Sequence, residues 1–213
     1  MVEFLKNRFS PYFEQNVFKG PLYTQAWAGL YIMVKIKIEN IVAYAQVSDL
    51  LDIELLSEKF SGASYNPAEF NGLSVKYDED KIAVIVLGTG KIVCTGAKTF
   101  EDAENFIKKV INRIKKVGFS IKADYQVKIE NAIVTTDFNK EMHLSSISKG
   151  LMLQHVEYKP EDFPGLIYRM DDLQAVLILF SSGKLVCTGA KSIEDAKNAV
   201  KMMEEKLSSI GAL

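Results

Sequence analysis

The nine residues GKIVCTGAK at positions 90–98 return as GKLVCTGAK at positions 183–191. Three shorter pairs recur upstream at nearly the same spacing: FNGL (70–73) and FPGL (163–166), YNP (65–67) and YKP (158–160), and IEN at both 38–40 and 129–131. Self-similarity at a fixed period is typical of a duplicated structural unit. We therefore expect two copies of one unit of about 90 residues, at 34–124 and 125–213, whereas residues 1–33 belong to neither copy.

The composition sets the broad class of the protein. The chain has 213 residues, 48% of them hydrophobic and 25% charged, and carries two cysteines. These values are typical of a soluble globular protein and exclude disorder, collagen-like repeats and a disulfide scaffold. Neither cysteine lies in a cluster with zinc spacing, so we expect no metal and no cofactor. The longest apolar stretch near the N-terminus, 26–34, is far short of the ~20 residues of a membrane-spanning helix and lacks a signal-peptide pattern, which favours the cytoplasm.

Each unit is predicted to contain one long strand, a short helix, several strands and a closing helix, in that order. Long strands rich in Ile and Val are expected at 35–47 and 125–136, and short helices at 52–60, with Asp52 as N-cap, and 145–153. Three further strands of the second unit are expected at 166–170, 175–180 and 185–188. The first closing helix carries an apolar stripe made of Ala103, Phe106, Ile107, Val110, Ile111 and Ile114. This order fits an α+β fold in which a curved antiparallel sheet carries helices on one face.

Two features of the sequence resemble the TATA-binding protein family, in its archaeal form: the segment YKPEDFPGLIYRM at 158–170 and the two copies of GK-x-VCTGAK. The resemblance spans 34–213. It implies a pseudo-symmetric saddle, a curved ten-stranded antiparallel sheet with four helices on the convex face. It also implies a general transcription initiation factor, not an enzyme, whose concave face binds the minor groove of A·T-rich promoter DNA and bends it with apolar wedges.

Eight residues at matching points of the two units are the expected base contacts, since the Asn and Thr among them resemble the family's pairs that bond the central base pairs. They are Asn40, Asn131, Thr95 and Thr188, with Val42, Ile133, Val93 and Val186 two residues away along the same expected strands. The period of a strand puts residues two apart on one face. The minor groove offers mainly adenine N3 and thymine O2 as acceptors, and an apolar side chain fills the space that the amino group of guanine needs. A single Asn or Thr could equally end a strand or turn, but four symmetric placements favour the DNA interpretation.

The resemblance implies two wedge residues in each unit, and one of them departs from the family. The wedges are Phe70 and Leu87 in the first unit and Phe163 and Phe180 in the second, where the family has Phe at all four places. Leucine is apolar but has no aromatic face to stack on a base, so we expect a weaker kink at the Leu87 end. The alternative, that Phe70 and Phe163 are ordinary core aromatics, is disfavoured by the Gly and Pro beside them.

Phosphate contacts require cations at the rim of the saddle. The formal net charge of −1 by itself argues against a nucleic-acid partner, but a sum hides its distribution. A lone Lys is ordinarily a solvated surface charge, whereas here the cations come in equivalent pairs. The resemblance points to six residues as phosphate contacts: Lys76, Lys91, Lys98, Arg169, Lys184 and Lys191. Cys94 and Cys187 alternate with the expected groove-facing residues, so we expect them in the core.

The resemblance also implies protein partners. These are transcription factor B and, through it, RNA polymerase, with Glu161 and Lys159 in the docking loop. Lys159 replaces the usual Glu, which weakens the expected contact. The first unit departs further from the family, with Asn71 in place of a usual Pro. The alternative is therefore a divergent paralogue that acts as a protein–protein interaction module with reduced DNA binding. A homodimer of the free protein stays open, and no membrane partner is expected.

No catalytic set emerges from the remaining residues. His143 and His155 are the only histidines, have no matching partners in the first unit, and are expected in loops or at the surface. The Gly-Lys turns lack the spacing of a phosphate-binding loop. Two interpretations of residues 1–32 stay open, since Met33 is a natural start. They are an upstream translation artefact, or an extension whose aromatic residues contact the body of the protein or a partner.

Overall fold

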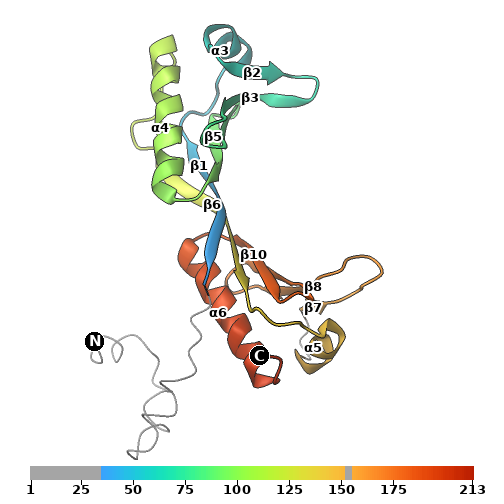
Figure 1. Cartoon of the computed structure of the whole chain (residues 1–213). Coiled ribbons are helices and arrows are strands. Elements are labelled where there is room, and N and C mark those ends of the chain that lie inside the picture. The colour runs from blue at the N-terminus through green and yellow to red at the C-terminus, as the bar shows by residue number, and fades with distance from the viewer. Residues whose placement is uncertain (1–34, 152–154) are drawn as a thin grey trace, which may run out of the picture. The chain divides into compact units, whose positions relative to one another are not determined.

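Two long strands, β1 (Lys37–Gln46) and β6 (Val127–Asp137), pair antiparallel at the centre of a ten-stranded sheet in the computed structural model (Figure 1). The structure describes residues 35–151 and 155–213. Within them the strand order is β2-β3-β4-β5-β1-β6-β10-β9-β8-β7. The order mirrors itself about the β1–β6 pair, so the two repeats make one continuous antiparallel sheet.

The other eight strands each pair only with strands of their own repeat, so the β1–β6 pair alone joins the two repeats within the described sheet. In the first repeat they are β2 (Ala63–Asn66), β3 (Phe70–Tyr77), β4 (Ile82–Leu87) and β5 (Lys91–Ala97). In the second repeat they are β7 (Val156–Glu157), β8 (Leu166–Met170), β9 (Ala175–Leu179) and β10 (Lys184–Ala190). The ten-stranded, two-repeat α+β fold is therefore confirmed.

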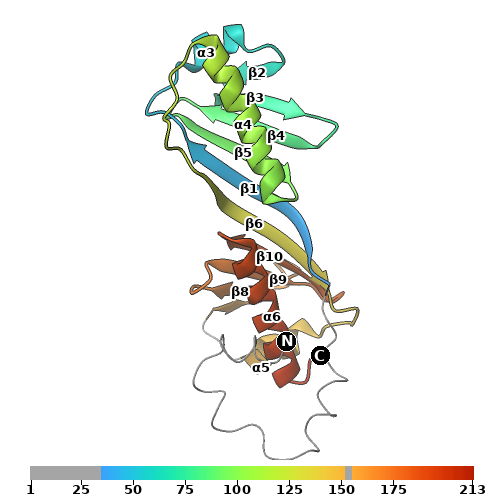
Figure 2. The same cartoon turned by 90° about the vertical axis from the view of Figure 1, so that its left-hand side faces the viewer.

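The described residues form four helices: α3 (Ile53–Lys59), α4 (Phe100–Val117), α5 (Leu144–Leu151) and α6 (Ile193–Ser209). Hydroxyl N-caps begin both long helices, since Thr99 and Ser192 accept the amide N–H of Asp102 and Asp195. The predicted N-cap Asp52 accepts the N–H of Leu55 and is confirmed. Helix α4 packs on β5 and β1, and α6 packs on β10 and β6 (Figure 2).

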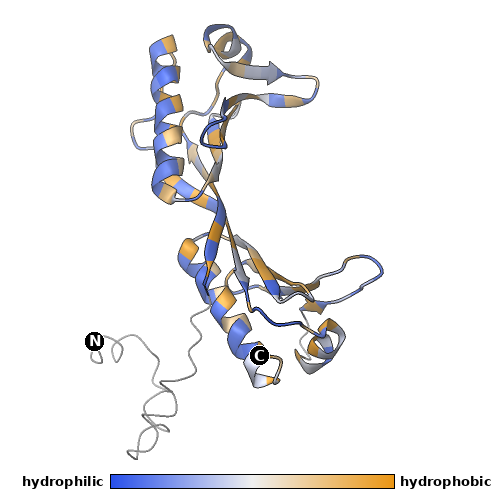
Figure 3. Ribbon diagram, in the orientation of Figure 1, coloured by the Kyte–Doolittle hydropathy of each residue, from blue (hydrophilic) through white to orange (hydrophobic). Residues whose placement is uncertain are grey.

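The core lies between these helices and one face of the sheet. The six predicted stripe residues of α4 are all buried, while the outer sides of α4 and α6 are mostly hydrophilic (Figure 3). Cys94 and Cys187 are fully buried, as expected. Burial raises the pKa of Cys94 to about 12 and that of Cys187 to about 11, so both thiols stay protonated near neutral pH.

The edges of the sheet are where the sequence prediction was incomplete. Residue patterning missed β2 and β7, because an edge strand pairs on one side only and can be short and polar. The second short helix begins at Leu144, one residue earlier than expected, and its described part is Leu144–Leu151. The predictions for 1–33 and for the end of that helix at 152–153 lie outside the described residues.

Candidate nucleic-acid interface

The face of the sheet opposite α4 and α6 is the inner side of its curvature (Figure 1). In β5 the core side holds Ile92 and Cys94, which are buried, while Val93 and Thr95 alternate with them and are half-buried. The same alternation runs through β1, β6 and β10. It places all eight predicted base-contact residues on this inner face, on four strands that are neighbours in the sheet.

Two matching polar pairs lie at the middle of the inner face. Asn40 Nδ2 donates to Thr95 Oγ1 at 3.2 Å, and Asn40 Oδ1 accepts the backbone N–H of Gly96 at 2.7 Å. In the second repeat Asn131 makes the same contacts with Thr188 and Gly189, at 3.2 and 2.7 Å. The Gly N–H fixes which way each amide is turned. Because an amide nitrogen carries two hydrogens, each Asn retains one donor for a partner.

Gly96 and Gly189 are site residues that the sequence interpretation did not identify. Their φ angles are +97° and +93°, a region that L side chains rarely adopt. A Cβ at either position would collide with a backbone carbonyl, that of Lys81 or Gln174. Only glycine can therefore hold the Asn amide from this point, and its recurrence in both copies of the duplicated segment was the available signal.

The predicted wedges form one pair at each end of the inner face. The rings of Phe163 and Phe180 lie edge to face, with centroids 6.1 Å apart. Phe70 and Phe163 are 52% and 37% exposed, so the alternative that they are core aromatics is wrong. At the other end, a Cβ on Gly72 would meet both the Phe70 ring and Leu87, which places these two side chains together above that glycine.

Gly165 supports the second pair as Gly72 supports the first. A Cβ on Gly165 would come 2.7 Å from the Phe163 ring and 2.9 Å from Ile178. Contacts closer than about 3 Å between carbon atoms are repulsive, so each glycine leaves the space that its ring occupies. In the sequence both glycines are loop signals, and the pattern does not indicate this role.

The predicted phosphate-contacting cations fall into three groups. Lys76, Arg169 and Lys184 are exposed on the inner face, and Lys98 and Lys191 are exposed directly after β5 and β10. Lys91 differs, because its Nζ lies 2.9 Å from Glu130 Oε2 and 4.2 Å from the centroid of the Tyr44 ring. All six side chains therefore lie at the surface, and one of them, Lys91, forms an ion pair with Glu130.

Two further lysines were missed. Lys37 and Lys128 each stand three residues before a site Asn, in the recurring segment KIEN, and both are exposed. Lys37 Nζ and Thr135 Oγ1 donate to Glu39 at 2.9 Å each, and these bonds, with the nearby charge of Lys98, lower the pKa of that carboxyl. The inner face therefore carries ordered carboxylates among its cations.

The predicted partner loop lies beside the second wedge pair. Lys159 and Glu161 are exposed in the turn between β7 and Phe163, which is closed by bonds from the N–H groups of Asp162 and Phe163 to the Lys159 carbonyl. Lys159 Nζ lies 3.4 Å from Glu157. The loop is therefore of mixed charge.

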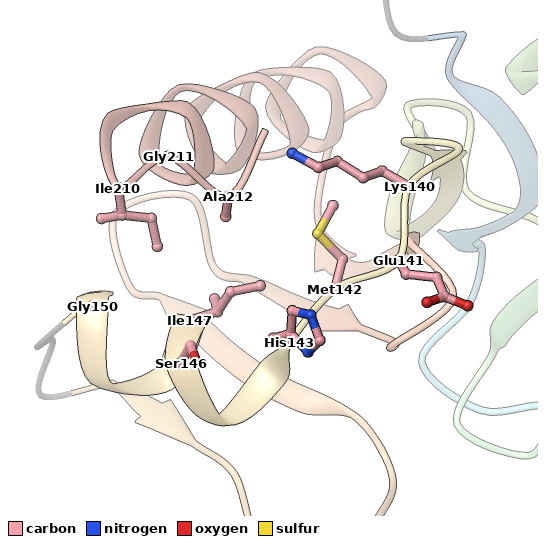
Figure 4. A pocket seen from close by; sticks show the side chains of 10 residues that line it. All are labelled: Lys140, Glu141, Met142, His143, Ser146, Ile147, Gly150, Ile210, Gly211 and Ala212. Atoms are coloured by element: carbon pink, nitrogen blue, oxygen red, sulfur yellow. The ribbon is translucent and has the colours of Figure 1, made fainter.

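The other polar groups make no second site on the described part of the chain. His155 is exposed, 3.7 Å from Asp171, and His143 lies exposed at a pocket of about 250 Å³ between α5 and the end of α6 (Figure 4). Residues 35–151 and 155–213 contain no group of three His, Cys, Asp or Glu placed to hold a metal ion. Among these residues no helix is both long and apolar enough to cross a membrane.

Comparisons with known proteins agree with the geometry. The model of the family described as transcription factor TFIID, or TATA-binding protein (TBP), matches residues 35–117 and 126–210, once in each repeat. TATA-box-binding proteins of Archaeoglobus fulgidus and Methanothermobacter thermautotrophicus are 40% and 41% identical over 179 and 177 residues. These alignments cover 84% and 83% of the chain, and 98% and 97% of the relatives.

A solved structure gives the same result for the fold. Methanococcus jannaschii TBP superposes with a TM-score of 0.72 at 40% identity, covering 82% of the chain and 99% of that structure. The alignment covers nearly the whole of that structure, and the alignments with the two relatives cover nearly the whole of those proteins. The agreement therefore extends over both repeats. The protein belongs to the TATA-binding protein family of transcription factors.

Proposed function

We propose that the protein is a general transcription initiation factor that binds TATA-like promoter DNA in the minor groove through the inner face of its sheet. The observation that carries the proposal is the pair of matching Asn–Thr sites, each held by a glycine N–H and flanked by half-buried Val or Ile. Relatives at about 40% identity are named TATA-box-binding proteins.

The chemistry of this face suits A·T base pairs. In the minor groove both orientations of an A·T pair show acceptors only, and the free hydrogen of each Asn amide is a donor. A G·C pair adds the guanine amino group, which would meet Val42, Val93, Ile133 or Val186. The face therefore accepts A·T steps in both orientations and excludes guanine by lack of space.

The wedge pairs supply the bend. Phe163 with Phe180, and Phe70 with Leu87, present apolar surface at the two ends of the face, where insertion between base steps would unstack them. The cations Lys76, Arg169, Lys98, Lys184 and Lys191 are placed to contact phosphates along the bent duplex. Bending thus brings more of the sheet against the widened groove.

On DNA, the protein would nucleate the preinitiation complex by binding transcription factor B, which brings RNA polymerase. The contact proposed for factor B is the exposed loop with Glu161 and Lys159. Lys159 brings a positive charge beside Glu157. A basic partner should therefore bind this loop less tightly than it would bind the same loop with Glu at position 159.

Gel-shift titration of an A·T-rich box against a matched G·C-substituted box tests the proposal. Wild type should shift the A·T probe in preference to the G·C probe. Asn131→Ala should lower that preference, since a lost base contact is worth roughly 1–3 kcal/mol. Phe163→Ala should reduce bending of the bound probe. Absence of any shift by the wild type at moderate salt would instead favour a protein–protein interaction module.

A further inference from the structure

Among the positions of the inner face at which the two repeats differ, one changes which lysine is paired. Tyr44 and Thr135 each stand four residues after the site Asn of their repeat. Glu39 and Glu130, one residue before each Asn, lie where the β1–β6 register shifts. Glu130 is paired with Lys91, whereas the lysines near Glu39 are Lys37 and Lys98.

On one half of the face, Glu130 is paired with Lys91. Lys91 Nζ lies 2.9 Å from Glu130 Oε2, and its ammonium group sits 4.2 Å from the centroid of the Tyr44 ring. Tyr44 lies directly across from Val93 in β5, two residues from Lys91 on the same face. An aromatic ring reaches such a diagonal neighbour, and the ring face attracts a cation. The Lys91 side chain is consequently only 32% exposed.

On the other half, Glu39 has different partners. Thr135 Oγ1 donates to Glu39 Oε1 at 2.9 Å, and Lys37 Nζ lies 2.8 Å from the same oxygen. Lys184, which is the equivalent of Lys91, is exposed, and no carboxylate within residues 35–151 and 155–213 lies at ion-pair distance from it. The short hydroxyl side chain of Thr135 holds the glutamate and gives no ring for a lysine.

We propose that Tyr44 is a positioning residue that keeps Lys91 bound to Glu130, so that Lys184 makes a phosphate contact which Lys91 does not make. This inference rests on the proposed function and adds a difference between the two halves of the DNA contact. Tyr44 also lines a hollow of about 460 Å³ with Lys128 and Lys191, which remain the cations for phosphate on that half.

The consequence is measurable, because each lysine that neutralises a phosphate releases counterions from the DNA. The slope of log K against log salt changes by about 0.9 for each phosphate neutralised on B-DNA. Tyr44→Thr copies the second repeat, so Glu130 should accept a hydrogen bond from the new hydroxyl and release Lys91, while Lys128 keeps its phosphate contact. Thr135→Tyr copies the first repeat, so Glu39 should pair with Lys184 while Lys37 stays beside the same carboxylate.

The experiment is fluorescence-anisotropy titration of an A·T-rich duplex at four salt concentrations with five proteins: wild type, Tyr44→Thr, Thr135→Tyr, the double exchange and Tyr44→Phe. Relative to wild type, the slope should be steeper by about 0.9 in Tyr44→Thr, shallower by about 0.9 in Thr135→Tyr, and restored in the double exchange. From 50 to 200 mM salt, Tyr44→Thr should lose affinity about 3.5-fold more than wild type. Tyr44→Phe keeps the ring and should retain the wild-type slope.

The outcomes separate this inference from the proposed function. Binding by all five proteins with equal slopes overturns the inference alone. A slope in Tyr44→Phe that equals that of Tyr44→Thr also overturns it, because the hydroxyl and not the ring would then hold Lys91. Absence of binding by the folded wild-type protein overturns both, and circular dichroism of each variant shows that it is folded.

Discussion

At the scale of single residues, the donor that would face DNA depends on a glycine behind it. The N–H groups of Gly96 and Gly189 hold the Oδ1 atoms of Asn40 and Asn131 at 2.7 Å, and both glycines have positive φ. The backbone thus orients the amides before any DNA arrives, so less side-chain freedom is lost on binding.

Replacing Gly189 by Ala should destabilise the protein by more than about 1 kcal/mol, because Ala is strained at positive φ and its Cβ would collide with the Gln174 carbonyl. Gly118→Ala is the matched control, since Gly118 has φ +104° with open space around it. Urea denaturation compares the two variants. Equal losses of unfolding free energy would contradict the collision.

The buried thiols give a pH prediction at the same scale. Burial raises the pKa of Cys94 to about 12 and of Cys187 to about 11, above the value of an unfolded thiol. Stability from these groups is complete below the unfolded pKa and is lost as pH rises through the folded pKa values. Neither thiol should react with a disulfide reagent at pH 8 until the protein unfolds. Rapid reaction of the native protein would contradict this prediction.

At the scale of elements, the two ends of the sheet differ in their wedges. In the second repeat, the ring of Phe163 on the β7–β8 loop meets that of Phe180, next to the end of β9. In the first repeat, Phe70 begins β3 and meets Leu87 at the end of β4. The same scaffold therefore presents two aromatic faces at one end and one at the other.

Leu87→Phe should increase the bend at the first-repeat end, because a second ring can stack on an unstacked base. Phe180→Leu, the reciprocal variant, should decrease the bend at the other end. Energy transfer between dyes at the two ends of a short duplex measures both. Unchanged transfer in both variants would show that the aromatic face is not what sets the bend.

Some of these elements could be predicted from the sequence and others could not. The duplicated segments predicted two units. The alternation of residues along a strand predicted Val93 and Thr95 on the inner face and Cys94 in the core. Both predictions succeeded because both signals are local in the sequence. The edge strands β2 and β7 carry little apolar alternation, and their pairing depends on distant β3 and β8. The Lys91–Glu130 pair joins β5 to β6, where the conformations of long side chains decide the contact and spacing does not.

At the scale of the whole molecule, near-neutrality is compatible with a DNA partner. The net charge is −1, while exposed lysines and Arg169 lie on the inner face and around it. Long-range attraction from the total charge is therefore small, and binding should depend on local phosphate contacts and on the fit of an apolar surface to a deformed groove. The central claim is that this surface reads the minor groove.

Substitution of inosine·cytosine pairs throughout the A·T-rich box tests that claim most directly. An inosine·cytosine pair shows the major groove of G·C but lacks the guanine amino group in the minor groove. The protein should bind the inosine·cytosine box about as tightly as the A·T box and much more tightly than the G·C box. Binding to the inosine·cytosine box as weak as to the G·C box would contradict the account, because the base pairs would then be read from the major groove.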